Sequence, residues 1–224
     1  MCLVPPMNLP LFPSHPECRL CARWEQAPLN PGVPTTQWGL PGAGVPVLIV
    51  IAPTPGYHEH MHNTPFMGKP GQLLRNIILD ELSTLCTIYG TYLARCGPNL
   101  DAKARDFKAC FSFHLSDLSA IFHQHPTQQI HILLLGSDAT TQFHRLHLGI
   151  RLPLKAALSI NGKPRTIFSR SVPVFATIHP AAVLRSHALI STIEDHIELL
   201  IATIKGCAPT PTDPDIQPAR SPHH

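Results

Sequence analysis

Four cysteines lie at spacings that suit a metal site. Cys18 and Cys21 form a Cys-x-x-Cys pair, and Cys96 and Cys110 form a second, wider pair. Two distant ligand pairs can close one site, and four thiolates suit either zinc or an iron–sulfur cluster. Because free cysteine is also a common small core residue, the second pair has a purely structural alternative. That structural interpretation is preferred for the remaining cysteines: Cys2, Cys86 and Cys207.

A second candidate for chemistry is a segment rich in Pro, Gly and His at residues 52–74, which follows a short apolar run at residues 45–51. Open α/β sheets bind ligands at the carboxyl ends of strands, and a connection of this length is usually functional. The plain alternative is a crossover stiffened by proline. The segment contains the polar run His58–His62, which has a metal-binding composition but is predicted to be a polar loop. Another histidine, His179, follows a later apolar run.

The elements that must position these residues alternate along the chain. Continuous apolar or β-branched runs predict four strands, at residues 47–51, 87–94, 130–135 and 172–178. Helical spacing of apolar residues predicts helices from Pro70 to about residue 85 and at residues 110–122, 138–147 and 186–205. Asn161–Gly162 predicts a turn within a small hairpin or extended excursion at residues 157–168. The alternation indicates an α/β fold: a three-layer α/β/α sandwich with a small, mostly parallel four-stranded sheet.

Length and composition limit the domain organisation. The 224 residues are 44% hydrophobic and 14% charged. They predict an irregular N-terminal segment at residues 1–16, one domain at residues 17–206 and a disordered tail at residues 207–224. No apolar run is long enough for a transmembrane helix, and no signal peptide is recognisable. We therefore expect an intracellular protein, in the cytoplasm or nucleoid, with reduced or metal-bound cysteines.

Charge and histidine content say less about function. The net charge of +3 permits nucleic-acid binding without arguing for it, because a basic footprint must be local to matter. The chain has 15 histidines, many of them near predicted element ends. We interpret these mainly as surface residues: His114, His123, His125, His144 and His147.

Four pieces, taken in chain order, resemble the uracil-DNA glycosylase superfamily, and most closely its iron–sulfur branch, family 4. The resemblance covers roughly residues 17–204. Its pieces are the Cys18/Cys21 pair, a Pro55–Gly56 turn followed by PFMGKPGQLL at residues 65–74, CGPN at residues 96–99 with Cys110 downstream, and TIHPAAVLR at residues 177–185. The second and fourth pieces together are specific.

The resemblance implies a DNA partner, a hydrolase activity and site residues. It implies a [4Fe–4S] cluster held by Cys18, Cys21, Cys96 and Cys110, with zinc as the less favoured occupant. His179 would stabilise the departing base, and Phe66 would stack on the flipped base beside the Pro55–Gly56 turn. Leu184 would enter the gap in the duplex, while Arg185 and Lys69 would hold phosphates. The plain alternatives are that Phe66 packs under its loop and that Leu184 begins the core face of the next helix.

Two positions depart from the family pattern. Pro53 stands where the family has a glutamate, and proline can neither activate water nor stabilise a cation. Glu59 is the nearest carboxylate and is a substitute candidate, with a solvated loop residue as the equal alternative. Tyr92 stands where the family has the asparagine that contacts the base edge, and one hydroxyl replaces an amide donor and acceptor.

Three functional hypotheses follow. The first is a monomeric DNA glycosylase of base excision repair, acting on uracil or another damaged base without membrane contact. The second is a superfamily member without catalysis that binds DNA or a protein partner. The third is an α/β protein with structural zinc and no role in DNA.

Overall fold

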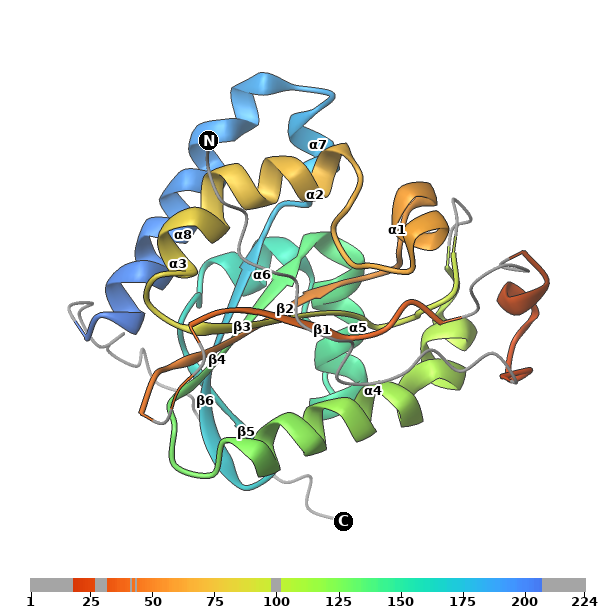
Figure 1. Cartoon of the computed structure of the whole chain (residues 1–224), viewed down its shortest axis with the longest axis horizontal. Helices are drawn as coiled ribbons and strands as arrows, with labels where there is room; N and C mark the ends of the chain where they lie inside the picture. Colours follow the sequence, from red (N-terminus) through yellow and green to blue (C-terminus); the bar gives the residue numbers. More distant parts are fainter. Residues whose placement is uncertain (1–17, 27–31, 41, 43, 98–101, 207–224) are drawn as a thin grey trace, which may run out of the picture.

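The computed structural model of the chain describes residues 18–26, 32–40, 42, 44–97 and 102–206. The predicted segments 1–16 and 207–224, and with them Cys2 and Cys207, lie outside these residues. The strands of the described part are β1 (Thr36–Gly39), β2 (Val47–Ala52), β3 (Thr87–Tyr92), β4 (Ile130–Leu135), β5 (Pro164–Ile167) and β6 (Arg170–Thr177). They form one sheet in the order β1-β3-β2-β4-β6-β5 (Figure 1). The four inner strands are parallel, and β1 and β5 pair antiparallel at the edges.

Helices cover both faces of this sheet. They are η1 (Ala22–Gln26), α1 (Tyr57–His62), α2 (Lys69–Leu74), η2 (Arg75–Leu79), α3 (Asp80–Leu82), α4 (Ala104–Gln124), α5 (Gly136–Leu148), α6 (Leu154–Leu158), α7 (Pro180–Val183), η3 (His187–Leu189) and α8 (Ile190–Ile204). In Figure 1, α2, α3 and α8 lie on one face and α4 and α5 on the other. Side chains of β2 alternate accordingly, because Leu48 packs in the core with α8 while Ile49 packs in the core with α4. The predicted three-layer, mostly parallel α/β fold is confirmed.

The predicted number of strands is wrong, since the sheet has six strands and the sequence predicts four. The missed strands, β1 and β5, are both edge strands of four residues. β1 lies before residue 47, where the sequence predicts no strand, and β5 forms a hairpin with β6. Strands this short carry too little alternation to be recognised, and their pairing partners define them.

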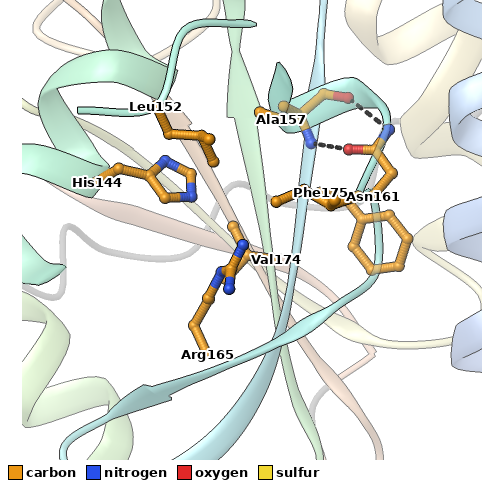
Figure 2. Close-up of a pocket in the computed structure, with 9 residues that line it drawn as sticks. His144, Leu152, Ala157, Asn161, Arg165, Val174 and Phe175 are labelled. Atoms are coloured by element: carbon orange, nitrogen blue, oxygen red, sulfur yellow. Dashed lines mark hydrogen bonds between the residues drawn. The ribbon is translucent and has the colours of Figure 1, made fainter. Parts of the chain in front are cut away.

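Asn161–Gly162 is not the turn of a hairpin. The β5–β6 hairpin turns at Phe168–Ser169, where both residues have left-handed φ angles of 47° and 61°. The Asn161 side chain instead forms two hydrogen bonds with the backbone of β6, in the way that a neighbouring strand would (Figure 2). Its Nδ2 donates to the Ala176 carbonyl oxygen at 2.9 Å, and the Ala176 N–H donates to Oδ1 at 2.8 Å. The adjoining cavity, of about 10 Å³, has room for a single water molecule and none for a base.

Two predictions about histidines are also wrong. The run predicted as a polar loop at residues 58–62 forms most of helix α1, and its Glu59 and His60 are buried. Of the five histidines assigned to the surface, His114, His125 and His144 are buried and His147 is half-buried, whereas His123 is exposed as expected. Burial lowers the pKa of each of the four non-exposed side chains, so these imidazoles are neutral at pH 7. A neutral imidazole packs like an aromatic core residue.

The strand order determines where a site can form. The chain leaves β2 toward β3 but leaves β4 toward β6, so the direction of winding reverses between β2 and β4. Ligands of open α/β sheets bind at the carboxyl ends of strands beside such a reversal. The segments after β2, β3 and β6 start at this edge, as the sequence predicts.

Candidate functional site

Residues from four parts of the chain converge at the carboxyl edge of the inner strands. Glu59 comes from α1 after β2, Phe66 from the turn before α2, Tyr92 from the last position of β3, and His179 from the residue before α7. Glu59 raises the pKa of both Tyr92 and His179, which shows that its carboxylate lies close to both. These four residues are named the edge site below.

Glu59 is a buried carboxylate in a helix, and the alternative of a solvated loop residue is wrong. Its side chain is only 6% exposed. Oε1 accepts a hydrogen bond of 2.8 Å from the Gly68 backbone N–H. Oε2 faces Gly56, where a methyl group would lie 2.7 Å from it. The Pro55–Gly56 turn and Gly68, the residue before α2, therefore enclose this carboxylate between them. Glu59 thus places a carboxylate beside the turn in which Pro53 replaces the family glutamate.

Phe66 is held by its backbone and by two aromatic neighbours. Its φ of 58° is left-handed, which is uncommon for a bulky residue. Its N–H donates to the Tyr92 hydroxyl at 3.1 Å. The ring centroids of Phe66 and Tyr92 are 5.5 Å apart, and Trp38 of β1 meets Phe66 edge-on at 6.0 Å. Phe66 is 5% exposed, so it packs under its loop in this structure.

Tyr92 is fully enclosed and neutral. Burial raises its pKa well above the ordinary value, and the Glu59 carboxylate raises it further. Its hydroxyl therefore keeps its proton at physiological pH. The hydroxyl oxygen of Tyr92 accepts from Phe66, and Glu59 lies close by. Tyr92 therefore connects the end of β3 to α1 and to the turn before α2.

His179 is oriented by a hydrogen bond to its own helix. It is the N-cap of α7, and its Nδ1 accepts from the Ala181 N–H at 3.1 Å. Burial lowers its pKa, Arg185 lowers it further, and Glu59 partly opposes them. The imidazole is therefore neutral at pH 7, and with Nδ1 accepting, its one proton is on Nε2.

Gly136, the first residue of α5, gives His179 the space it occupies. Its φ of 85° is left-handed, and an added Cβ would lie 2.8 Å from the Cβ of His179. Both features favour glycine. From the sequence, Gly136 is recognisable only as the residue after a predicted strand, so its contact with His179 could not be predicted.

The remaining predicted site residues lie around this edge. Pro55 is buried and Gly56 is half-buried, and both lead into α1. Lys69 is exposed at the first position of α2. Leu184 is 42% exposed, which excludes the alternative that it begins a core face, and Arg185 beside it is also exposed.

Arg75 is a further member of this neighbourhood that the sequence did not indicate as a site residue. Its Nη2 donates to the Pro65 carbonyl oxygen at 3.5 Å, and its charge interacts with the Glu59 carboxylate. Burial lowers its pKa without removing its charge. A cation inside an otherwise apolar helical repeat was the available signal.

The four predicted cysteine ligands lie near one another. Burial raises the pKa of Cys96 to about 12, and the neighbouring thiols of Cys110, Cys18 and Cys21 contribute to this rise. Burial raises the pKa of Cys110 as well, and Cys18 and Cys21 act on it in the same direction. In the part of the chain that the structure describes, no three His, Cys, Asp or Glu side chains are close enough to hold a metal ion. The donor set therefore matches a four-thiolate group in kind without forming a closed ligand shell.

Two buried arginines lie beside Cys96 and Cys110. Arg23 is 5% exposed, and its Nε donates to the Cys96 carbonyl oxygen at 2.9 Å. Arg95, 1% exposed, pairs through Nη2 with Asp117 and donates to Thr35 at 3.1 Å. Its Nε and Nη1 have no hydrogen-bond partner among the described residues, and its positive charge opposes the rise that burial causes in the pKa of Cys110. Buried N–H donors and positive charge beside thiols suit an anionic group, so these surroundings fit a thiolate-bound cluster.

Comparisons with known proteins agree with this geometry. Residues 42–203 match the family model described as Uracil DNA glycosylase superfamily. The chain is 25% identical to the Type-4 uracil-DNA glycosylase of Saccharolobus solfataricus over 154 residues, which are 66% of this chain and 67% of that protein. The predicted resemblance to the superfamily and its type-4 branch is confirmed. The family match includes the edge site, Cys96 and Cys110, and begins after Cys21. Within the described residues, no helix is long and apolar enough to cross a membrane.

Proposed function

The chain belongs to the uracil-DNA glycosylase superfamily, and from this premise we propose that it excises uracil or another deaminated base from DNA. In this reaction the bond between the base nitrogen and C1′ of the sugar breaks, and water supplies the oxygen that bonds to C1′. One proton of that water leaves the oxygen and neutralises the departing base. The products are the free base and an abasic site.

The observation that best supports this proposal is the fixed tautomer of His179. Its Nδ1 is occupied as an acceptor from Ala181, so the neutral ring presents Nε2–H as a donor. Departure of a base leaves negative charge on its ring nitrogens and carbonyl oxygens, and a donor already in place stabilises that charge without reorganisation. A neutral donor also leaves the base as an anion that is protonated afterwards. His179 is therefore proposed to contact the leaving base.

Glu59 is proposed to supply the negative charge that the site lacks at Pro53. As the base leaves, the sugar becomes cationic, and a buried carboxylate stabilises such a cation more than a solvated one does. Glu59 is buried, is fixed by Gly68 N–H and interacts electrostatically with His179. It is also a candidate for orienting the attacking water.

Phe66, Pro55 and Gly56 are proposed to line the place of the flipped base. An aromatic ring stabilises an extrahelical base by stacking. Because Phe66 is 5% exposed, the base must displace part of its present surroundings before it stacks. The turn before α1 would form the adjoining wall, beside the carboxylate of Glu59.

Lys69, Leu184 and Arg185 are proposed to contact the DNA around the flipped nucleotide. All three side chains are exposed, and Leu184 is an unusually exposed apolar residue beside a cation. An apolar wedge occupies the gap that the base leaves, and cations bind the flanking phosphates.

The cysteines Cys18, Cys21, Cys96 and Cys110 are proposed to hold a [4Fe–4S] cluster, with zinc as the less favoured occupant. The donor set and the buried arginines around it support this, and the resemblance to family 4 favours iron. When bound, the cluster would connect residues 18–21 to the end of β3 and to α4. We propose no chemical step of base excision that passes through it.

The organisation of the protein is part of the same proposal. We propose that residues 17–206 form one glycosylase-like domain that acts as a monomer on intracellular DNA.

Excision from oligonucleotides tests the function directly. Protein purified without oxygen is incubated with oligonucleotides that contain uracil, hypoxanthine or xanthine, and alkali-labile sites are counted. We expect product with at least one base and a loss of about 10²- to 10³-fold in His179→Ala. His187→Ala, which removes an exposed histidine of the same region, is the matched control. Absence of product from all three bases would contradict the proposal.

A second candidate function is DNA binding without excision. Pro53 at the position of the family carboxylate and Tyr92 at the position of the base-contacting asparagine favour it. Such a protein would bind uracil-containing DNA or single strands without forming product, and its affinity would fall as salt rises. Fluorescence anisotropy on the same oligonucleotides separates the two functions.

A further inference from the structure

The contact between Tyr92 and Phe66 assigns Tyr92 a role of its own. We propose that Tyr92 is a positioning residue that holds Phe66 in place, and that it does not select the base by contacting its edge. The inference rests on the proposed function for its meaning in catalysis. Its central contact, the Phe66 N–H donating to the Tyr92 hydroxyl at 3.1 Å, is independent of that function.

The backbone conformation of Phe66 needs a restraint. Its φ of 58° is costly for a residue with a bulky side chain, and such conformations persist only where the surroundings impose them. The Phe66 backbone also lies against Gly71 of α2, where an added Cβ would be 2.2 Å from the Phe66 carbonyl oxygen. The close helix on one side and the tyrosine hydroxyl on the other restrain one strained peptide.

The ring of Phe66 is restrained as well. An added Cβ on Gly90 of β3 would lie 2.6 Å from Cε2 of Phe66 and 2.3 Å from the Trp38 ring. Trp38 and Tyr92 therefore flank the Phe66 ring, which packs over Gly90, where β3 has no side chain. Residues of β1 and β3 hold the phenyl ring before any base arrives.

Tyr92 has little hydrogen-bonding capacity left to offer a base. Its hydroxyl oxygen is already accepting from Phe66, and its pKa is raised, so the group is a neutral donor with one proton. An asparagine amide presents a donor and an acceptor side by side, which distinguishes uracil from cytosine. Tyr92 is only 2% exposed and has one hydroxyl proton, so it presents no open donor–acceptor edge to a base. While its oxygen accepts from the Phe66 N–H, no base carbonyl can use that N–H.

Arg75 supports the same arrangement from the helix side. It donates to the Pro65 carbonyl oxygen, next to Phe66 in the chain, and contacts the Met67 sulfur at 3.7 Å. Its charge also interacts with Tyr92. The peptides on both sides of Phe66 are thus restrained by the residues that surround Tyr92.

Hydrogen exchange of the Phe66 amide tests the proposal without any need for activity. Tyr92→Phe keeps the ring and removes the acceptor, and we expect exchange of this amide, measured by NMR, to rise about 10- to 100-fold. Tyr89→Phe is the matched control, because Tyr89 is on the same strand but its hydroxyl pairs with His125 Nε2 at 2.7 Å. A rise below about threefold, or an equal rise in the control, would overturn the proposal.

A milder substitution keeps the test valid if Tyr92→Phe does not fold. Replacing Tyr92 with 3,5-difluorotyrosine retains the ring and weakens the oxygen as an acceptor. A smaller rise in exchange of the same amide is expected, and no rise would count against the proposal.

The ratio of excision rates tests the second half of the proposal. A positioning residue affects every base alike, so Tyr92→Phe should lower the rates for uracil and hypoxanthine by the same factor. A base-selective change in the ratio, or a rise in either rate, would overturn it. If no base is excised at all, the proposed function fails, whereas the exchange result still tests the Tyr92–Phe66 contact.

Discussion

The edge site and the cysteine region differ in how their chemical groups are held. In the edge site, three functional groups each have a backbone N–H partner: Gly68 for Glu59, Phe66 for Tyr92 and Ala181 for His179. In the cysteine region, burial raises the pKa of the Cys96 and Cys110 thiols, and the described residues contain no closed ligand set. The edge site is thus assembled by hydrogen bonds within the fold, whereas the described part of the cysteine region contains no such assembled set.

Removal of one cysteine should separate the two regions most strongly. We expect Cys96→Ser to lose most of its iron and visible absorbance, because a four-thiolate cluster needs every ligand. Iron and sulfide analysis on anaerobically purified protein measures this. Cys86→Ala is the control, because Cys86 is buried in the core, and burial raises its thiol pKa to about 12. Full iron content in Cys96→Ser would show that Cys96 is not a cluster ligand, and a colourless wild type would show that the cysteine region holds no iron–sulfur cluster.

Neutralising the carboxylate should act on the edge site alone. We expect Glu59→Gln to lower the single-turnover excision rate about hundredfold while iron content stays unchanged. The pH profile sharpens the test, because Glu59 raises the pKa of His179 against burial and Arg185. Without Glu59 that pKa falls further, so the acid limb due to His179 should move to lower pH. An unchanged rate and an unchanged limb would place Glu59 outside the reaction.

Adding one methyl group tests how closely the fold sets His179. Gly136→Ala combines a left-handed φ with a contact at 2.8 Å to His179 Cβ. We expect a loss of about 1–3 kcal/mol in the free energy of unfolding, measured in urea, together with slower excision. Gly149→Ala shares the left-handed conformation, but nothing lies within 4 Å of its added Cβ, so it should lose stability and keep its rate. Equal rates in the two variants would mean that His179 tolerates displacement.

The smallest effect is expected outside both regions. His131 of β4 is fully buried, and burial lowers its pKa to about 4. The unfolded chain, with an ordinary pKa near 6.5, binds this proton first, so stability is lost as pH falls from 6.5 toward 4. His131→Leu should remove up to about 2 kcal/mol of the stability lost between pH 6.5 and 5, as measured by urea unfolding.

The exposed His123 provides the control for this measurement. His123→Leu should leave the dependence of stability on pH as in the wild type. An identical acid dependence in wild type and His131→Leu would show that His131 does not titrate over this range. His131 of β4 would then provide no measure of acid sensitivity outside the edge site and the cysteine region.

The sequence predicted the parts of the fold that carry long apolar runs. All four inner strands were located, and β4 was predicted with its observed bounds, because a strand buried on both faces is apolar throughout. The edge strands and α1 were missed, since neither a four-residue strand nor a run of histidines carries a periodic signal. Their conformation is set by neighbours that are distant in sequence.

The same distinction applies to the edge site. Motif positions led to Phe66 and His179, and strand ends explain why both lie at one edge of the sheet. The burial of Glu59 could not be predicted, because it depends on a hydrogen bond from Gly68, the residue before the next helix α2. Arg75, Trp38 and Gly136 were missed for a similar reason, as each acts through a contact between separate elements.

The position of β2 in the sheet has a consequence during synthesis. β2 is made first among the inner strands, yet both of its neighbours, β3 and β4, come later in the chain. A nascent chain that has reached β3 can pair one side of β2, while the other side stays open until β4 leaves the ribosome. Val47–Ala52 is apolar throughout, so this open strand is the segment most exposed to aggregation and to chaperone binding at that stage. The strand that becomes the most protected part of the folded protein is thus its most vulnerable part while it is being made.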